Sequence, residues 1–327
     1  MTQQNPARST DPDAIEPMTV SDAADVSQSM VENVSRVIVG KDEEIEDVIV
    51  GLLAGGHLLL EDVPGVGKTM LARSIARSID CTFSRIQFTP DLLPTDVTGV
   101  NVYNQQTGTF EFQPGPVFGN IVLGDEINRA PPKTQSALLE AMEESQVTVD
   151  GETHRTPEPF VVIATQNAVE RDRTYELPAA QIDRFMKQLR MGYPDSGDEK
   201  EVLKRAAGHH PIDELSPVAT ERDVLRARET VVEVTVEEPI REYVIDLAEY
   251  TRENAVLGVS PRGSIQLVRA AKARAVLDGR EYVVPDDVKR EALSVFGHRV
   301  RRGSDDRIGS EAGREIVRSA LDRVPVQ

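Results

Sequence analysis

Between about residues 40 and 195, short apolar runs alternate with stretches whose apolar residues recur at helical spacing. This alternation is typical of a parallel β-sheet covered by helices, because each strand needs a crossover that returns the chain to the same edge. The sequence therefore predicts an α/β fold. The predicted strands are His57–Leu60, Phe83–Phe88, Ile121–Gly124, Phe160–Thr165 and Gln188–Met191.

Two hairpin-like inserts interrupt this alternation. One covers about residues 99–112, and the other covers about residues 147–155, where Asp150-Gly151 is a turn signal. After residue 195 the strand signals end and helical periodicity takes over, which predicts a separate all-helical domain. The helices predicted there lie at about 198–207, 220–230, 237–253, 262–278 and 285–296.

The N-terminal residues resemble neither region. They are rich in Thr, Gln, Pro, Asp and Ser and lack apolar periodicity, so residues 1–25 are expected to form a disordered tail. A helix is expected to begin in the twenties, where apolar residues recur near helical spacing at Val26, Met30, Val34 and Val37. The predicted division is a tail of residues 1–25, an α/β core of residues 26–195 and a helical domain of residues 196–327.

The stretch after the first predicted strand has the composition of a phosphate-binding loop. Gly65 and Gly67 permit the backbone angles that turn N–H groups inward toward phosphate oxygens. Lys68 then reaches the β- and γ-phosphates, and the Thr69 hydroxyl is placed to bind Mg²⁺. The helix that follows presents its N-terminal dipole to the same anion. The residues expected to contact ATP here are Pro64, Gly65, Val66, Gly67, Lys68, Thr69 and Met70.

This loop departs from the pattern GxxxxGK[ST], because Asp62 occupies the first glycine position. Asp62 stands at the strand exit, before the turn that encloses the phosphates, and aspartate tolerates turn conformations. We therefore prefer a nucleotide-binding loop to an ordinary glycine turn between a strand and a helix.

Two carboxylates end the third predicted strand. Asp125 is placed to hold Mg²⁺, and Glu126, which points to the other side, can polarise an attacking water. An apolar run that ends in two acids is common, and it gains weight here because it follows a phosphate-binding loop. The next predicted strand leads into Asn167, whose carboxamide can orient the water between Glu126 and the γ-phosphate. Taken alone, Asn167 is more simply a turn residue.

The chain is strongly acidic, with 37 Lys and Arg against 55 Asp and Glu, a formal net charge of −18 and a pI near 4.8. This balance argues against an extended nucleic-acid groove, which needs clustered cations to neutralise phosphates. The charge fits either a surface adapted to high salt or a surface that repels polyanions. We favour salt adaptation.

The chain has one cysteine, Cys81, so no intrachain disulfide is possible and a reducing, cytoplasmic location is expected. No apolar run approaches the length of about 18 residues that a membrane helix needs, and no apolar leader is present, so no membrane segment is expected.

Asp25, Ser27 and Ser29 spell the DxSxS pattern of a von Willebrand A metal site. That site needs a buried strand before the aspartate, so we interpret the pattern as part of a helix.

Six strings carry a resemblance that covers nearly the whole chain from about residue 30. They are His57–Thr69, Gly124–Lys133, Leu138–Glu144, Ala164–Asn167, Leu177–Phe185 and Ser260–Arg262. Together they resemble the MoxR family of AAA+ ATPases. Gly124 and Ala168 stand where the family commonly has Ala and Pro, and neither change removes a functional group.

The resemblance implies an AAA+ P-loop nucleotide domain followed by a C-terminal all-helical lid domain. ATP and Mg²⁺ are the implied ligands, with Thr69 and Asp125 at the metal. The implied assembly is a ring-shaped homo-oligomer, with six subunits expected, in which ATP lies between neighbouring subunits.

The resemblance also implies roles for single residues. Asn167 would be the sensor 1 residue, and Arg262 would be the sensor 2 residue that reads the γ-phosphate as the lid closes. Arg184 would be the arginine finger given to the ATP of the neighbouring subunit, a role that suits a planar, permanently charged guanidinium. Val39 and Gly40 match the adenine pocket.

Other interpretations of these positions stay open. Arg184 could instead form an ordinary ion pair, and the finger could come from Arg171, Arg173 or Arg129. The insert at 147–155 would be the pre-sensor hairpin that faces the pore of the ring.

The implied function is ATP hydrolysis that remodels client proteins in a chaperone-like role, with a separate von Willebrand A protein as a partner. A nucleic-acid motor of the ring-helicase type is one alternative, but the 147–155 hairpin carries more acid than base. The ATPase subunit of a metal chelatase is a second alternative. A non-hydrolysing nucleotide-bound scaffold is a third, and the presence of Glu126 speaks against it.

Overall fold

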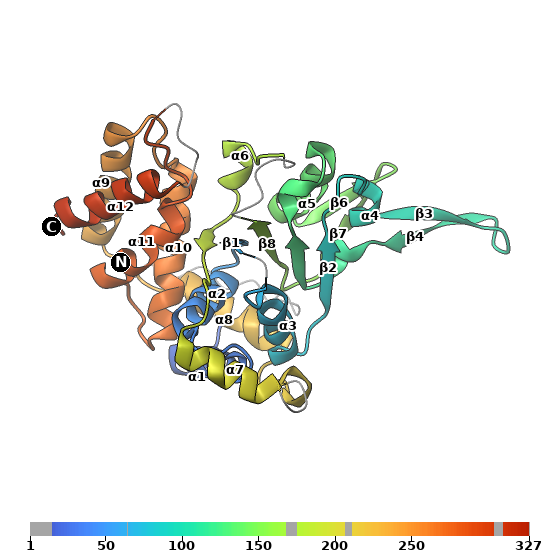
Figure 1. Cartoon of the computed structure of the whole chain (residues 1–327), viewed down its shortest axis with the longest axis horizontal. Coiled ribbons are helices and arrows are strands. Elements are labelled where there is room, and N and C mark those ends of the chain that lie inside the picture. The colour runs from blue at the N-terminus through green and yellow to red at the C-terminus, as the bar shows by residue number, and fades with distance from the viewer. Residues whose placement is uncertain (1–14, 64, 168–174, 207–210, 304–309, 327) are drawn as a thin grey trace, which may run out of the picture.

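The computed structural model describes residues 15–63, 65–167, 175–206, 211–303 and 310–326. At its centre is a five-stranded parallel sheet with the strand order β2-β5-β8-β1-β9 (Figure 1). The five predicted strands are confirmed. Their bounds are β1 Leu58–Asp62, β2 Phe83–Gln87, β5 Ile121–Asp125, β8 Val161–Asn167 and β9 Lys187–Leu189.

Apolar side chains leave both faces of the sheet, because successive residues of a strand point in opposite directions. In β1, Leu58 and Leu60 belong to one buried cluster, whereas Leu59 belongs to a second cluster on the other face. A parallel sheet needs cover on both faces, and helices provide it. The first cluster includes helices α1 Val20–Ser35, α2 Asp42–Leu53 and α3 Lys68–Ser78, and the second includes α5 Pro132–Glu144.

Both predicted hairpins are confirmed. Each is an antiparallel pair, and the turn of the second uses left-handed backbone at Asp150 (φ 50°) and Gly151 (φ 87°). The first hairpin extends well beyond the rest of the molecule (Figure 1). The pairs are β3 Gly99–Asn104 with β4 Thr109–Pro114, and β6 Gln146–Val149 with β7 Glu152–Arg155. Short helical segments are α4 Pro94–Thr98, α6 Ala179–Ile182 and the 3₁₀ turns Pro116–Phe118, Ile127–Arg129 and Pro211–Glu214.

The C-terminal part of the described chain is helical, as expected. The bounds are α7 Ser196–Ala206, α8 Glu221–Glu233, α9 Glu238–Asn254, α10 Pro261–Leu277, α11 Pro285–Phe296 and α12 Glu311–Arg323. The first five helices match the five predicted ones. The sequence pattern did not predict α12, whose buried apolar residues are only Ile316, Val317 and Ala320.

The helical part packs closely against the core. Helices α8 and α10 pack against α1 and α2, and apolar residues from all four helices share one buried cluster. Figure 1 shows α9 to α12 grouped on the side of the sheet opposite the β3–β4 hairpin. The predicted domain boundary at residue 195 stays a prediction, because the buried cluster is continuous across it.

The predicted disordered tail is too long, because residues 15–25 are ordered. Helix α1 begins at Val20, and the hydroxyl of its N-cap Thr19 accepts a hydrogen bond from the backbone of Asp22 (3.1 Å). Met18 is buried, and its N–H and C=O both hydrogen-bond the Thr230 hydroxyl on α8 (3.1 and 2.8 Å). Residues 1–14 lie outside the described part of the chain.

The DxSxS pattern lies within α1. Ser27 is buried there, and its hydroxyl donates a hydrogen bond to the Ala23 carbonyl. The residues before the helix, 15–19, are not a strand. The interpretation of this pattern as part of a helix therefore agrees with the structure.

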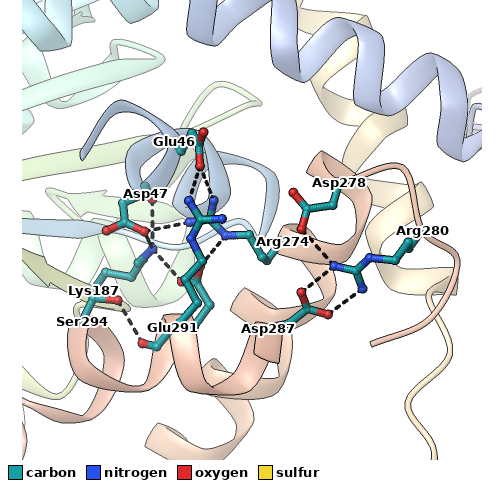
Figure 2. A network of polar contacts seen from close by, with 10 residues as sticks. Glu46, Asp47, Lys187, Arg274, Asp278, Arg280, Asp287, Glu291 and Ser294 are labelled. Atoms are coloured by element: carbon teal, nitrogen blue, oxygen red, sulfur yellow. Dashed lines mark hydrogen bonds and ion pairs between the residues drawn. The ribbon is translucent and has the colours of Figure 1, made fainter. Parts of the chain in front are cut away.

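A buried network of charges joins the edge strand β9 to α2, α10 and α11 (Figure 2). Lys187 is fully buried and lies 2.6 Å from both Glu291 and Asp47. Arg274, 1% exposed, contacts Glu291 (2.7 Å), Asp47 (2.9 Å) and Glu46 (2.7 Å). Buried charges are tolerated only when they are paired, so this network fixes the position of the C-terminal helices on the sheet.

Across the ranges that the structure describes, no helix combines the length and apolar character needed to cross a membrane.

Cys81, just before β2, is half-buried, and burial raises the pKa of its thiol to about 12. The thiol is therefore protonated at neutral pH, as expected for a cysteine that packs against the core.

Candidate active site

Four strands of the sheet end in polar residues. These are Asp62 of β1, Gln87 of β2, Asp125 of β5 and Asn167 of β8. Asp62 pairs in register with Asn167, and Gln87 pairs with Asp125. Ligands of open parallel sheets bind at the carboxyl ends of the strands, so these residues mark the candidate site.

The predicted phosphate-binding loop connects β1 to α3. Gly65 (φ 88°) and Gly67 (φ 93°) both adopt left-handed backbone, and Gly67 caps α3. A residue with a side chain would be strained at either position. The Lys68 amine donates a hydrogen bond to the carbonyl of Val63 (2.9 Å), which keeps it inside the loop. Pro64 lies outside the described residues.

Asp62, the departure from the glycine pattern, has a structural role. One carboxylate oxygen accepts a hydrogen bond from the N–H of Val63 (2.8 Å). The other accepts hydrogen bonds from the N–H groups of Met191 (2.7 Å) and Gly192 (2.8 Å), just beyond β9. The side chain is 6% exposed. Asp62 therefore fastens the start of the loop to the segment that leads into α7.

Asp125 is held from two sides. The Thr165 hydroxyl donates a hydrogen bond to Oδ1 (2.7 Å), and the Arg85 guanidinium contacts Oδ2 (2.5 Å). A carboxylate and the Thr69 hydroxyl nearby are hard oxygen ligands of the kind that Mg²⁺ prefers, and Mg²⁺ keeps several waters. The residues therefore fit a magnesium–nucleotide complex.

Glu126 follows directly, with a left-handed backbone (φ 56°, ψ 50°) and its N–H donated to the Thr165 hydroxyl (2.9 Å). Its Oε2 accepts hydrogen bonds from Gln87 (3.0 Å) and Arg129 (2.7 Å). This backbone conformation is uncommon for a residue with a side chain, and Glu126 lines the same cavity as Asp125. Three other arginines were considered as the arginine finger. Of these, Arg129 pairs with Glu126 of its own chain, and Arg171 and Arg173 lie outside the described residues.

A cavity of about 450 Å³ joins these groups. The residues that line it are Gly65, Gly67, Lys68, Thr69, Met70, Arg85, Gln87, Asp125, Glu126, Thr165 and Asn167. The predicted phosphate, magnesium and water-orienting residues are thus brought together by the fold. The sequence reasoning missed Arg85, Gln87 and Thr165. Alternation along β2 places Arg85 and Gln87 on one face of the strand, but their approach to Asp125 depends on the pairing of β2 with β5, which the sequence does not indicate.

A second cavity, of about 200 Å³, adjoins the first through Gly65, Gly67 and Met70. Its lining is mainly apolar and includes Val66 and the predicted adenine-pocket residue Val39. Gly40 does not line it. Gly40 instead has left-handed backbone (φ 68°) and packs against Asp198, where a Cβ would collide with the carboxylate.

Arg184 and Arg262 lie elsewhere. The two guanidinium groups contact the same carboxylate, that of Glu143, each at 2.9 Å. They line a cavity of about 390 Å³ together with His57 and Phe160, which precede β1 and β8. A strand of five residues spans about 16 Å, so this cavity is separated from Lys68 by the length of the sheet. Within one chain, neither arginine is brought to the cavity of Lys68.

A second set of contacts fixes Arg184 relative to α10. Asp183 accepts hydrogen bonds from Ser260, the N-cap of α10 (3.1 Å), and from the buried Arg299 (2.8 Å). Burial lowers the pKa of Arg299 to about 10, which leaves it charged at neutral pH. Arg184 and Arg262 therefore lie on one surface, linked through the contacts of Glu143 and Asp183.

Comparisons with known proteins show the family to which the chain belongs. The model of the ATPase family associated with various cellular activities (AAA) matches residues 57–187, and the AAA lid domain model matches residues 247–320. The uncharacterized protein YeaC of Bacillus subtilis is 51% identical, over 91% of this chain and 94% of its own length.

Chaperone MoxR1 of Mycobacterium tuberculosis is 42% identical, over 87% of this chain and 78% of its own length. A crystal structure of a candidate ATPase from Cytophaga hutchinsonii superimposes with a TM-score of 0.86 at 38% identity, and it covers 94% of this chain and 97% of its own. The chain belongs to the MoxR family of AAA+ ATPases.

Proposed function

We propose that this chain binds ATP with Mg²⁺ at the carboxyl end of the sheet and hydrolyses it between the subunits of a ring, to remodel client proteins. The observation that supports this proposal most directly is the arrangement of Lys68, Asp125 and Glu126 around one cavity. The pair of arginines at the opposite end of the sheet is the second observation.

In the proposed reaction, Lys68 neutralises charge on the β- and γ-phosphates, while Thr69 and Asp125 hold Mg²⁺. The metal supplies a positive charge that orients the phosphates. Glu126 accepts the proton of the attacking water, and Asn167 orients that water. Gln87 and Arg129 both contact Oε2 of Glu126, so among the described contacts Oε1 is the oxygen left to accept the proton.

We further propose that Arg184 and Arg262 both act on the ATP of a neighbouring subunit. They lie on one surface and share Glu143, whereas ATP in their own chain would lie at the far end of the sheet. When the γ-phosphate of the neighbour approaches, it replaces Glu143 as the partner of these guanidinium groups. In this arrangement Arg262 acts on the nucleotide of a neighbour and not, as a sensor 2 residue was expected to do, on the nucleotide of its own chain.

The composition of the β3–β4 hairpin favours a protein as the client. It extends away from the core (Figure 1) and exposes Tyr103 (53%) and Phe110 (70%). Its sixteen residues, 99–114, contain one charged residue, Glu111, although 28% of the chain is charged. A nucleic acid would need cations there, so the ring-helicase alternative is not favoured. We propose that the hairpins contact the client and that a separate von Willebrand A protein selects it.

The test of hydrolysis compares the wild type with Glu126→Gln and Lys68→Ala at several protein concentrations. We expect phosphate release per subunit to rise with concentration, because the site is completed by a neighbour. Glu126→Gln should bind ATP normally and lose at least about a hundredfold in rate, as expected for a missing proton acceptor. Lys68→Ala should lose binding. Equal loss of ATP binding in both variants would contradict these roles.

The test of the arginines uses mixed rings. Arg184→Ala and Lys68→Ala should each be inactive alone, the first with normal ATP binding. Mixing them should restore phosphate release, because an Lys68→Ala subunit still offers Arg184 to an intact loop. Arg262→Ala mixed with Lys68→Ala should behave in the same way. Absence of rescue would show that the arginine acts within its own chain or has only a structural role.

A further inference from the structure

A groove on the helical part of the molecule adjoins the cavity of Arg184 and Arg262 but is lined by neither arginine. It has a volume of about 640 Å³ and is formed by α8, α9, α10 and the end of α2. Its apolar lining includes buried Leu53, Val231 and Val244. Three further apolar side chains at the groove are exposed, namely Val232 (66%), Ile245 (49%) and Ile265 (55%). Clustered apolar exposure of this kind marks interaction surfaces.

The charge of the groove is opposite to that of the protein. Arg228, Arg241, Arg269 and Lys272 line it, and the described lining contains no Asp or Glu. The whole chain has a net charge of −18. Arg269 is exposed, and the Nη2 atom of Arg228 is buried without an acceptor among the described residues. Arg269 can therefore pair with a carboxylate from outside the chain, whereas the Arg228 Nη2 atom is too deeply buried to be reached.

The groove is continuous with the cavity that holds Arg184 and Arg262. Gly55, Arg228 and Arg269 line both. If these two arginines face the ATP of a neighbouring subunit, the groove faces the same subunit, next to its nucleotide. The inference below therefore rests on the proposed function.

On the nucleotide side of each subunit, α7 lies beside the apolar cavity next to the phosphate-binding loop. Val202 and Arg205 of α7 line that cavity. Leu203 is 66% exposed and Val202 is 41% exposed. Glu199, which is also exposed, lies three and four residues before them, so the three side chains share one face of the helix. This face combines apolar residues with a carboxylate, as the groove requires.

We propose that the groove of one subunit receives α7 of the next subunit in the ring. Leu203 packs against Ile245 and Ile265, and Glu199 pairs with the cations of the groove. Because α7 also lines the nucleotide cavity of its own chain, ATP binding stabilises the helix in the position that docks. The contact thus couples nucleotide occupancy to ring assembly.

The test measures the ring population by sedimentation velocity with a slowly hydrolysed ATP analogue. Leu203→Asp and Ile265→Asp should each raise the protein concentration needed for half-assembly at least about tenfold, because each places a carboxylate in an apolar contact. Lys204→Glu is the control, since Lys204 is an exposed charge (80%) on the same helix, away from the docking face. ATP-analogue affinity of the monomer shows that each variant is folded.

A charge exchange makes the test specific to the pair of surfaces. Arg269→Glu and Glu199→Arg should each weaken assembly, and the double variant should recover it, because the two charges are only interchanged. A ring that persists in both single aspartate variants overturns this contact and leaves the groove to an acidic segment of another protein. A wild-type chain that stays monomeric at every concentration overturns the proposed ring as well.

Discussion

Asp62 shows how one side chain can replace a glycine of a common pattern. Its position was explained from the sequence by tolerance for turns. The structure gives a stronger reason, because its carboxylate accepts three backbone hydrogen bonds and joins the phosphate-binding loop to Met191 and Gly192. These partners lie about 130 residues away, so no local pattern could have indicated them.

Asp62→Asn should weaken both the fold and ATP binding. The amide can present only one acceptor oxygen, so at least one backbone N–H group is left without a partner, at a cost of about 1–3 kcal/mol. We expect a lower unfolding midpoint in urea and a weaker affinity for ATP. The matched control is Glu61→Gln. The carboxylate of Glu61 contacts Arg190, which is half-exposed. If Asp62→Asn behaves like this control, the carboxylate does not hold the loop.

His57 gives a prediction about pH. Burial lowers the pKa of its ring to about 4, while Nε2 contacts the Met142 carbonyl and Nδ1 accepts a hydrogen bond from the Val162 N–H. The unfolded chain binds a proton near pH 6.5 and the folded chain does not. Titration of His57 therefore does not reduce the free energy of unfolding above about pH 6.5. It reduces this free energy by up to about 3 kcal/mol as the pH decreases toward about 4.

Urea unfolding of the wild type and of His57→Gln, measured across this pH range, checks the prediction. Glutamine can make both hydrogen bonds and does not titrate, so the variant should lose less stability on acidification. The titration of carboxylates is common to both proteins and cancels in the comparison. Identical pH dependence in the two proteins would show that His57 has no such role.

The candidate site could be predicted where chemistry follows a local pattern. Lys68 ends a glycine loop that follows an apolar strand, Asp125, Glu126 and Asn167 end or follow apolar strands, and the parallel sheet brings these strand ends together. Arg85 could not be predicted in this way, because its contact with Asp125 depends on which strand neighbours β5.

Among the elements, strands and hairpins were easier to predict than the packing of the helices. The strands carry strong apolar runs, whereas α12 has few apolar residues and was missed. The location of Arg262 depends on how α10 packs against α1 and α2, and no pattern within α10 specifies that packing. The network of Figure 2 is part of this packing, because it joins α10 and α11 to β9.

Lys187→Met should test this joint between elements. The substitution leaves Glu291 and Asp47 with fewer cations in a buried site, and breaking a buried ion pair costs about 3–5 kcal/mol. The double variant Lys187→Met with Glu291→Leu removes both charges and should be more stable than Lys187→Met alone. The free energy of unfolding in urea measures both. A double variant that loses the sum of the two single effects would show that the pair is not coupled.

Considered as a whole, the molecule combines a net charge of −18 with a groove whose charged lining residues are all basic. Repulsion among the acids should destabilise the monomer at low salt, so its thermal midpoint should rise when KCl is added. If simple screening is responsible, the rise should be nearly complete by about 0.1–0.2 M, where the Debye length is about 8–10 Å.

If the surface is adapted to high salt, the midpoint of thermal unfolding should keep rising as the KCl concentration enters the molar range. Thermal unfolding of Lys68→Ala, followed across KCl concentrations, separates the two, because this variant does not bind the nucleotide that would couple unfolding to ring assembly. Sucrose at matched osmolality is the control for general exclusion of solutes from the protein surface. We expect the midpoint to continue rising in KCl beyond the sucrose curve. A plateau at low salt would instead support an acidic surface whose role is to repel polyanions.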